Sequence, residues 1–233
     1  MRLKSKSAGR DRGLVFVASC VPWRLGVLAV QGFFGRIADF GPIVGELGLG
    51  GAPAVRFVFP HAPMRPVTIN NGYVMRAWYD VSFGDLEGKS RKADEKGVRD
   101  SEAQIAALVQ REARRGTAAA KVVLAGFSQG GAIALQTGLR YPEPLAGIMA
   151  LSTYLPLAAV LPQEASPANK KTPIFMAHGV YDPVVAYIMG TGSRMTLAGL
   201  GYEVEWREYA MQHSVCAEEV RDIGGWLRKI LKA

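Results

Sequence analysis

The stretch Lys121-Val-Val-Leu-Ala-Gly-Phe-Ser-Gln-Gly-Gly-Ala-Ile-Ala-Leu135 decides the fold of this chain. Its first half, Val122 to Ala125, is a continuous apolar run followed by glycine, which predicts a short buried strand. From Gly130 to Leu139 the residues are helix formers with apolar side chains at packing intervals, which predicts a helix. Ser128 therefore lies on a tight turn between a strand and a helix.

The turn around Ser128 is typical of a reactive serine. A turn this tight brings backbone against backbone, so side chains at Gly126 and Gly130 would clash. The serine is raised off the end of the sheet, and the first N–H groups of the helix point at whatever bonds to it. This is the geometry of a nucleophile elbow. The pattern Gly-x-Ser-x-Gly is common by chance, so the strand and helix around it carry the prediction.

The composition indicates a globular protein with one domain. The chain has 233 residues, of which 49% are hydrophobic and 21% are charged, and this length suffices for one sizeable core. Its two cysteines, Cys20 and Cys216, form no disulfide framework, which favours a reducing, cytoplasmic location. No uncharged apolar run is long enough to span a membrane.

The net charge of +8 is concentrated near the N-terminus. Residues 1–36 carry a net charge of +6 and the remaining residues +2, so a basic segment precedes a nearly neutral body. No stripe of basic residues interleaved with aromatic ones runs through that body, which argues against nucleic-acid binding. We expect residues 1–12 to be a basic flexible tail and residues 13–233 to form a single domain.

Two interpretations of the apolar runs at 13–20 and 26–30 compete. In the first, the runs are two short strands at the edge of the sheet. In the second, the basic start, a short apolar core and Val17-Ala18-Ser19-Cys20 form a lipoprotein signal that is processed at Cys20. The apolar core is at the lower length limit for an export signal, which favours the strands and a cytoplasmic protein.

Strands and helices alternate over the rest of the chain. Strands are predicted at 55–59, 146–151, 174–177 and 204–209, and helices at 39–47, 94–115, 184–200 and 217–231. This alternation predicts an α/β fold in which a mostly parallel sheet has helices on both faces. Residues 60–71 are expected to form a long loop. Trp78 and Tyr79 precede another polar segment and are candidate substrate walls, with core packing as the alternative.

A serine hydroxyl needs a base to take its proton and an acid to orient that base. On this fold the order is serine, acid, histidine, each after the end of a strand. His213 follows the strand at 204–209, where the base is expected, and Asp182 is the single aspartate between Ser128 and His213. The alternatives are a turn residue at 182 and a surface histidine at 213. His178 ends a strand and is expected to pack or bond locally.

The reaction also needs donors for the oxyanion of the tetrahedral intermediate. One is expected at the backbone N–H of Gln129, directly after the serine. The other is expected at the backbone N–H of Phe33, in the loop Gln31-Gly32-Phe33 that follows an early apolar run.

From about Asp39 to its end, the chain resembles the phospholipase/carboxylesterase family of α/β-hydrolases, which includes acyl-protein thioesterases. The matching segments are Val55–Pro63, Ala77–Asp80, Leu124–Ala132, Ser152–Leu155, Ala177–Gly179, Asp182–Val185 and His213–Cys216.

The resemblance implies a single-domain α/β-hydrolase fold with a triad of Ser128, Asp182 and His213, and no metal or cofactor. It also implies an apolar acyl groove and often a homodimer, and Leu155 is a further candidate for contact with substrate. The expected activity is that of a serine carboxylesterase. It would hydrolyse short- to medium-chain carboxylic esters, lysophospholipids or acyl thioesters through an acyl-enzyme on Ser128.

The chain departs from the family pattern near its N-terminus. Where the family has His-Gly-Leu-Gly, this chain has Gln31-Gly32-Phe33-Phe34, so that only the first glycine is kept. The altered segment 31–37 bears on the second oxyanion donor. It suggests a second hypothesis, in which a protein with the hydrolase fold binds an acyl ligand or a partner and turns over weakly.

Overall fold

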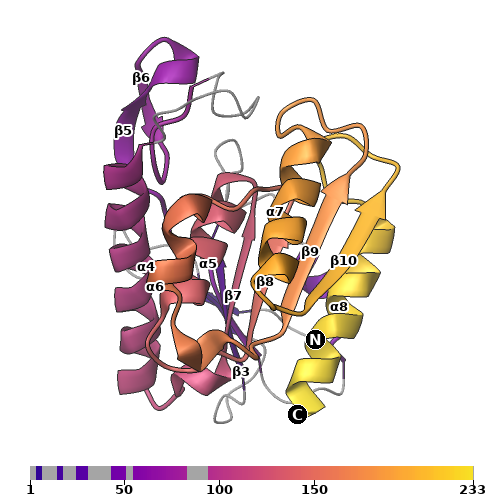
Figure 1. The fold of residues 1–233 in the computed structure, drawn as a ribbon. Coiled ribbons are helices and arrows are strands. Elements are labelled where there is room, and N and C mark those ends of the chain that lie inside the picture. The colour runs from indigo at the N-terminus through magenta and orange to yellow at the C-terminus, as the bar shows by residue number, and fades with distance from the viewer. Residues whose placement is uncertain are drawn as a thin grey trace.

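An eight-stranded sheet is the centre of the computed structural model, which describes residues 4–6, 15–17, 25–30, 43–50, 55–82 and 94–232 (Figure 1). The two strands at one edge pair antiparallel with their neighbours, and the other six run parallel. The prediction of a mostly parallel sheet is confirmed. In order across the sheet, the strands are β1 (Lys4–Lys6), β2 (Val15–Val17), β4 (Val55–Val58), β3 (Leu25–Val30), β7 (Val122–Phe127), β8 (Gly147–Leu151), β9 (Ile174–Gly179) and β10 (Val204–Tyr209).

Helices cover both faces of the sheet, as the sequence predicts (Figure 1). On one face lie α4 (Glu95–Arg114), α5 (Gln129–Arg140), α6 (Leu161–Glu164) and α7 (Tyr187–Gly199), and on the other lie α2 (Ile43–Glu46) and α8 (Ala217–Lys232). The longer helices begin and end within three residues of their predicted bounds. α2 lies within the helix expected at 39–47, of which residues 39–42 lie outside the described part of the chain.

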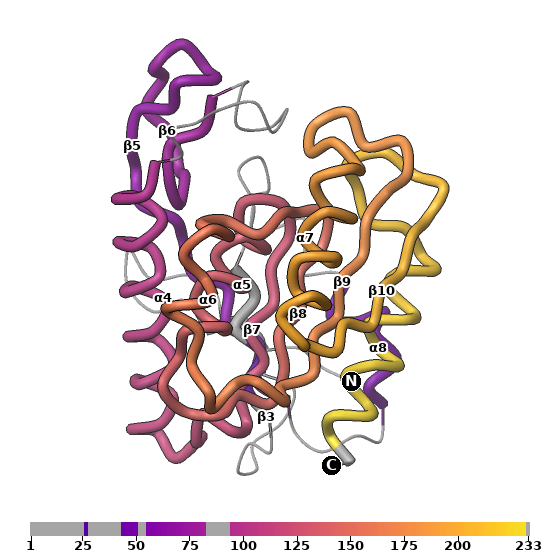
Figure 2. The backbone as a smooth tube through the Cα atoms, viewed as in Figure 1, coloured from indigo at the N-terminus to yellow at the C-terminus, as the bar shows by residue number. Residues whose placement is uncertain are grey.

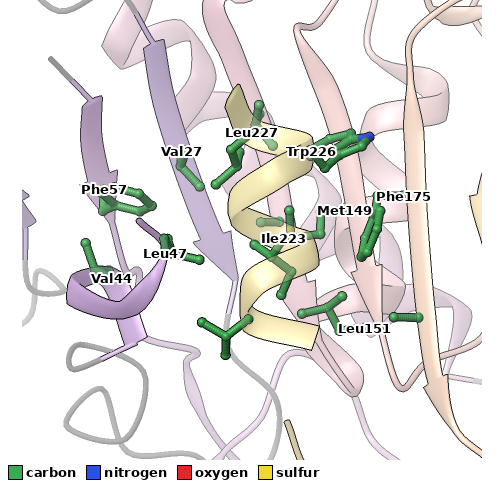
Figure 3. Close-up of a cluster of buried hydrophobic side chains, with 14 of the residues drawn as sticks. Val27, Val44, Leu47, Phe57, Met149, Leu151, Phe175, Ile223, Trp226 and Leu227 are labelled. Atoms are coloured by element: carbon green, nitrogen blue, oxygen red, sulfur yellow. The ribbon is translucent and has the colours of Figure 1, made fainter. Parts of the chain in front are cut away.

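The sequence of β7 is apolar without interruption because the strand is buried on both faces. Side chains alternate between the two faces of a strand, and both faces of β7 are buried. Val122 and Leu124 pack in the cluster beneath α4 and α5, whereas Val123 and Ala125 pack beneath α8. Figure 3 shows the second of these clusters, in which Ile223, Trp226 and Leu227 of α8 lie over residues of the sheet and α2.

Residues 60–76 differ from the expected loop. They include an antiparallel hairpin of β5 (Met64–Val67) and β6 (Tyr73–Arg76), joined by the 3-10 turn η1 (Thr68–Asn70). The hairpin lies above the start of α4 (Figure 2), and Arg65 pairs with Asp94, the N-cap of α4, at 3.4 Å. The loop prediction was wrong because hairpin pairing uses the main chain, and most side chains of β5 and β6 are not buried.

The early apolar runs do form strands, but only one lies near the edge of the sheet. β2 is the second strand from the edge, whereas β3 lies between β4 and β7 near the centre, which corrects the expectation of an edge position. β1 lies within residues 1–12, for which the sequence predicts a flexible tail. Cys20 lies outside the described residues. In the ranges that the structure describes, no helix has both the length and the apolar character needed to cross a membrane.

Candidate active site

Ser128 lies between β7 and α5 with a strained backbone. Its φ of 55° and ψ of −126° place a non-glycine residue in a region that L-amino acids rarely adopt. Two backbone hydrogen bonds hold this conformation: the N–H of Ser128 donates to the carbonyl of Leu151 at 2.8 Å, and the N–H of Ala132 donates to the carbonyl of Ser128 at 3.1 Å. Such strain persists only where the surroundings enforce it, which is typical of functional sites.

The glycines on either side of Ser128 make this turn possible. A Cβ atom on Gly126 would overlap the carbonyl group of Gly130, and one on Gly131 would lie 2.8 Å from Cγ2 of Thr153. The expected clash at Gly126 is therefore confirmed. The backbone of Gly130 leaves no room for a side chain at position 126. The strand and the helix pack too closely at this point for any side chain.

Asp182 lies in the turn after β9, at the same edge of the sheet as Ser128. Its Oδ1 accepts hydrogen bonds from the N–H groups of Val184 at 2.8 Å and Val185 at 2.9 Å. Its Oδ2 lies 2.6 Å from Nδ1 of His213. Burial raises the pKa of Asp182, but the bonds from His213, Val185 and Val184 outweigh burial and hold that pKa below its ordinary value. The carboxyl group is therefore ionised at neutral pH.

His213 lies in the loop after β10, and its ring contacts both Asp182 and Phe127. Because an ionised carboxylate only accepts, Nδ1 carries the proton of the 2.6 Å bond to Asp182 and Nε2 is left as the basic nitrogen. The ring centroid lies 4.7 Å from that of Phe127, the residue directly before Ser128. The structure has no hydrogen bond between Ser128 and His213, both of which are described. Such bonds are often long before a substrate binds.

His178, near the end of β9, also lies close to the carboxylate of Asp182. Its Nε2 lies 3.0 Å from the carbonyl of Val185 and 3.5 Å from Oδ2 of Asp182. Gly190 packs so closely against Nδ1 that a Cβ atom there would overlap the ring. Burial lowers the pKa of His178, so its ring is neutral. The expectation that His178 packs and bonds locally is confirmed.

The three candidate substrate walls lie in the core. Trp78 and Tyr79 are 1% and 3% exposed and pack beneath α4 and α5, while Leu155 is 6% exposed and packs in the cluster beneath α7. Tyr79 also shares a hydrogen bond of 2.9 Å with the hydroxyl of Tyr154. For Trp78 and Tyr79, this burial favours the alternative interpretation, core packing.

The residue patterns alone do not locate two features of the site. One is the side chain of Gln129, which makes two buried hydrogen bonds to the backbone of residues 78 and 79. The other is an apolar pocket beside Phe127, which directly precedes Ser128, and Val215, which lies two residues after His213. It is lined by Val27, Ile43, Val44, Leu47, Phe57, Phe59, Ala125, Gly126, Phe127, Met149, Leu151, Val215, Ile223 and Leu227.

Two further expectations concern the second oxyanion donor and a metal ion. The backbone donor expected at Phe33 lies outside the described residues, as does the whole segment 31–37. Among the residues that are described, no group of three or more His, Cys, Asp and Glu side chains could hold a metal ion.

Comparison with protein families matches residues 51–231 to the phospholipase/carboxylesterase model. The chain belongs to the phospholipase/carboxylesterase family. Acyl-protein thioesterase 1 of Neurospora crassa is 45% identical over 184 residues, and the match covers 76% of this chain and 74% of that protein. Because it belongs to this family, the chain is a hydrolase with the α/β-hydrolase fold, as the sequence motifs indicate.

Solved structures with the same architecture support the fold. Arabidopsis thaliana SOBER1 superposes with a TM-score of 0.80 at 30% identity, covering 89% of this chain and 99% of the other. Zea mays acyl-protein thioesterase 2 superposes with a TM-score of 0.78 at 27% identity, covering 94% of this chain and 99% of the other. The similarity therefore extends over nearly the full length of both structures.

Proposed function

We propose that this protein is a serine carboxylesterase in which Ser128, Asp182 and His213 form the catalytic triad. The observation that carries the proposal is the pairing of a strained serine turn with a partly buried Asp182–His213 hydrogen bond of 2.6 Å at the same edge of the sheet. The contact between His213 and Phe127 supports it further, because it brings the base beside the residue that precedes the nucleophile.

In the proposed reaction, Nε2 of His213 takes the proton of the Ser128 hydroxyl as Oγ attacks the carbonyl carbon of the ester. The carbonyl electron pair moves to oxygen, where the backbone N–H of Gln129 and that of Phe33 are the proposed donors. When the electron pair returns, the bond to the leaving oxygen or sulfur breaks and His213 protonates that atom. Water then repeats the same steps on the acyl-enzyme and releases the acid.

The proposed substrates are short- to medium-chain carboxylic esters, with lysophospholipids and acyl thioesters as further members of the class. The apolar pocket beside Phe127 supports an apolar acyl group, since its lining is free of charged side chains in the described part of the chain. The names of the relatives, acyl-protein thioesterases, support the thioesters. The proposed setting is the cytoplasm, and a homodimer remains a prediction.

Hydrolysis of p-nitrophenyl butyrate tests this proposal. The wild-type protein should give a burst of p-nitrophenol followed by steady turnover, and Ser128→Ala should abolish both. Ser166→Ala is the matched control, because Ser166 lies between α6 and the turn at 167–169 and its side chain makes no cap hydrogen bond. Turnover by Ser128→Ala at the wild-type rate would refute the assignment of the nucleophile.

The altered segment 31–37 favours one other function, an acyl-binding protein with weak turnover. A fluorophosphonate probe separates the two, because it reacts with an activated serine whether or not the acyl-enzyme is hydrolysed quickly. Labelling of Ser128 together with negligible steady-state hydrolysis would favour binding, whereas labelling together with sustained turnover favours the esterase.

A further inference from the structure

The first turn of α5 has few side chains to hold it. The first N–H groups of a helix lack partners within the helix, and the side chain of the N-cap residue, Ser128, accepts no hydrogen bond from this one. The first three helical residues are Gln129, Gly130 and Gly131. Gln129 therefore carries the only side chain that can tie this turn to the rest of the protein.

The side chain of Gln129 makes two complementary hydrogen bonds. Its Oε1 accepts from the backbone N–H of Trp78 at 2.8 Å, and its Nε2 donates to the backbone carbonyl of Tyr79 at 2.7 Å. The residue is 4% exposed, and both bonds are buried. Because an unpaired backbone group is costly in such surroundings, both contacts resist opening.

The segment that Gln129 holds is itself fixed from several sides. The N–H of Ala77 donates to the carbonyl of Pro63 at 3.0 Å, and the N–H of Asp80 donates to Oδ2 of Asp94 at 2.8 Å. The hydroxyl of Ser101, on α4, donates to the carbonyl of Trp78. Residues 77–80 are thus anchored to α4 and to the loop before β5, and they give Gln129 a rigid support.

We infer that the side chain of Gln129 is a positioning group, which anchors the first turn of α5 and so fixes the backbone N–H of Gln129 where the oxyanion forms. This inference rests on the proposed function, in which that N–H is an oxyanion donor. A donor must lie 2.7–3.1 Å from the oxyanion to be effective. Without the anchor, the Gln-Gly-Gly turn can tilt, because glycine restricts the backbone least.

The test compares Gln129→Met with Gln136→Met. Methionine keeps the length of glutamine but has no strong hydrogen-bonding group. Gln136 is the matched control, since it lies on the same helix, is fully buried and makes one side-chain hydrogen bond, to Glu102 at 2.8 Å. Gln129→Met should lower kcat about 10- to 100-fold with KM within about twofold, because misplacing one donor weakens transition-state binding. Gln136→Met should lose stability but keep kcat.

A second measurement separates positioning from a merely structural role. A boronic acid forms a tetrahedral adduct with the serine, so its affinity should fall in Gln129→Met by the same factor as kcat. Affinity for the carboxylic acid product should stay unchanged. If Gln129→Met does not fold, Gln129→Asn decides by the same criteria, because it keeps an uncharged amide that is one methylene too short to reach both Trp78 and Tyr79.

Two outcomes would overturn the inference. One is a folded Gln129 variant with kcat and boronic acid affinity within twofold of wild type, and the other is an equal loss of kcat in the Gln129 and Gln136 variants. Ser128→Ala distinguishes these from a failure of the proposed function. If Ser128→Ala is inactive while the Gln129 variants are fully active, only the positioning role is wrong; if Ser128→Ala is active, the proposed site is wrong.

Discussion

Replacing Glu219 by glutamine should make the protein more stable at neutral and alkaline pH. Glu219 lies in the first turn of α8, is 0% exposed, and has no hydrogen bond of normal geometry to either carboxyl oxygen in the described structure. Burial raises the pKa of Glu219 to about 8; the nearby backbone N–H of Cys216 opposes that rise, and the charge of Asp222 adds to it.

The sign and size of the effect follow from this pKa. In the unfolded chain Glu219 ionises near its ordinary value of 4.5, whereas in the folded protein it stays protonated up to about pH 8. Below pH 4.5 both states are neutral and no penalty exists. Each pH unit above that value removes about 1.4 kcal/mol from the free energy of unfolding, until the folded state ionises too. The penalty is thus on the order of 3 kcal/mol at pH 7.

Glutamine cannot ionise, keeps the shape of the side chain, and can still accept from the N–H at the helix start. Urea unfolding of Glu219→Gln should therefore show a gain below about 1 kcal/mol at pH 5 and on the order of 4 kcal/mol at pH 8.5, with an unchanged m-value. Glu218→Gln is the control, because it removes a charge from the same turn at an exposed position and should change stability by less than about 1 kcal/mol.

Two results would refute this reasoning. A gain of the same size at both pH values would mean that glutamine acts through packing and not through the removal of a buried charge. No gain at pH 8.5 would mean that the folded protein stabilises the ionised carboxylate, and so that Glu219 has a partner when charged.

Two further predictions concern the turn and the base. Gly126→Ala should yield no active, folded enzyme, because its Cβ would overlap the carbonyl of Gly130; Gly192→Ala on α7, where a Cβ meets nothing within 4 Å, should raise the melting temperature by a few degrees. Ester hydrolysis should vanish in His213→Gln, because glutamine cannot take the proton of the serine hydroxyl. His178→Gln should keep the activity, since glutamine can still donate to the carbonyl of Val185; loss of activity there would point to His178 as the base.

The parallel sheet is the part of the fold that the sequence predicts best. The strands β7, β8 and β9 are buried on both faces, so each is a short apolar run that stands out from the polar segments around it. The same burial explains why α5 was predicted close to its observed bounds, since every residue from Gln129 to Leu139 is buried. Where burial decides the side chain, the pattern can be recognised without the structure.

The hairpin of β5 and β6 illustrates the opposite case. Only Val67 among its eight strand residues is buried, so the hairpin has no alternating pattern of apolar and polar residues. Pro66 further weakens the strand signal, because proline has no N–H for a ladder. The pairing Met64 to Arg76 through Val67 to Tyr73 depends on backbone groups that every sequence supplies. The one signal in the residue types is the turn pair Asn71-Gly72, both with positive φ, and the exposed strands on either side gave it no support.

The same distinction runs through the candidate site. Ser128, Asp182 and His213 could be named from the sequence because their chemistry needs particular side chains, and parallel strands bring the ends of β7, β9 and β10 to one edge. The supporting contacts of Gln129 could not be predicted from the sequence, because they join a side-chain amide to backbone atoms 50 residues away. Trp78 and Tyr79 were predicted to contact substrate because their side chains are aromatic. In the structure, their backbone groups bind the side chain of Gln129, next to the serine turn. When a side chain bonds to the backbone, its partner can be any residue type, so the sequence does not reveal the pair. Contacts of this kind can be found only from the structure.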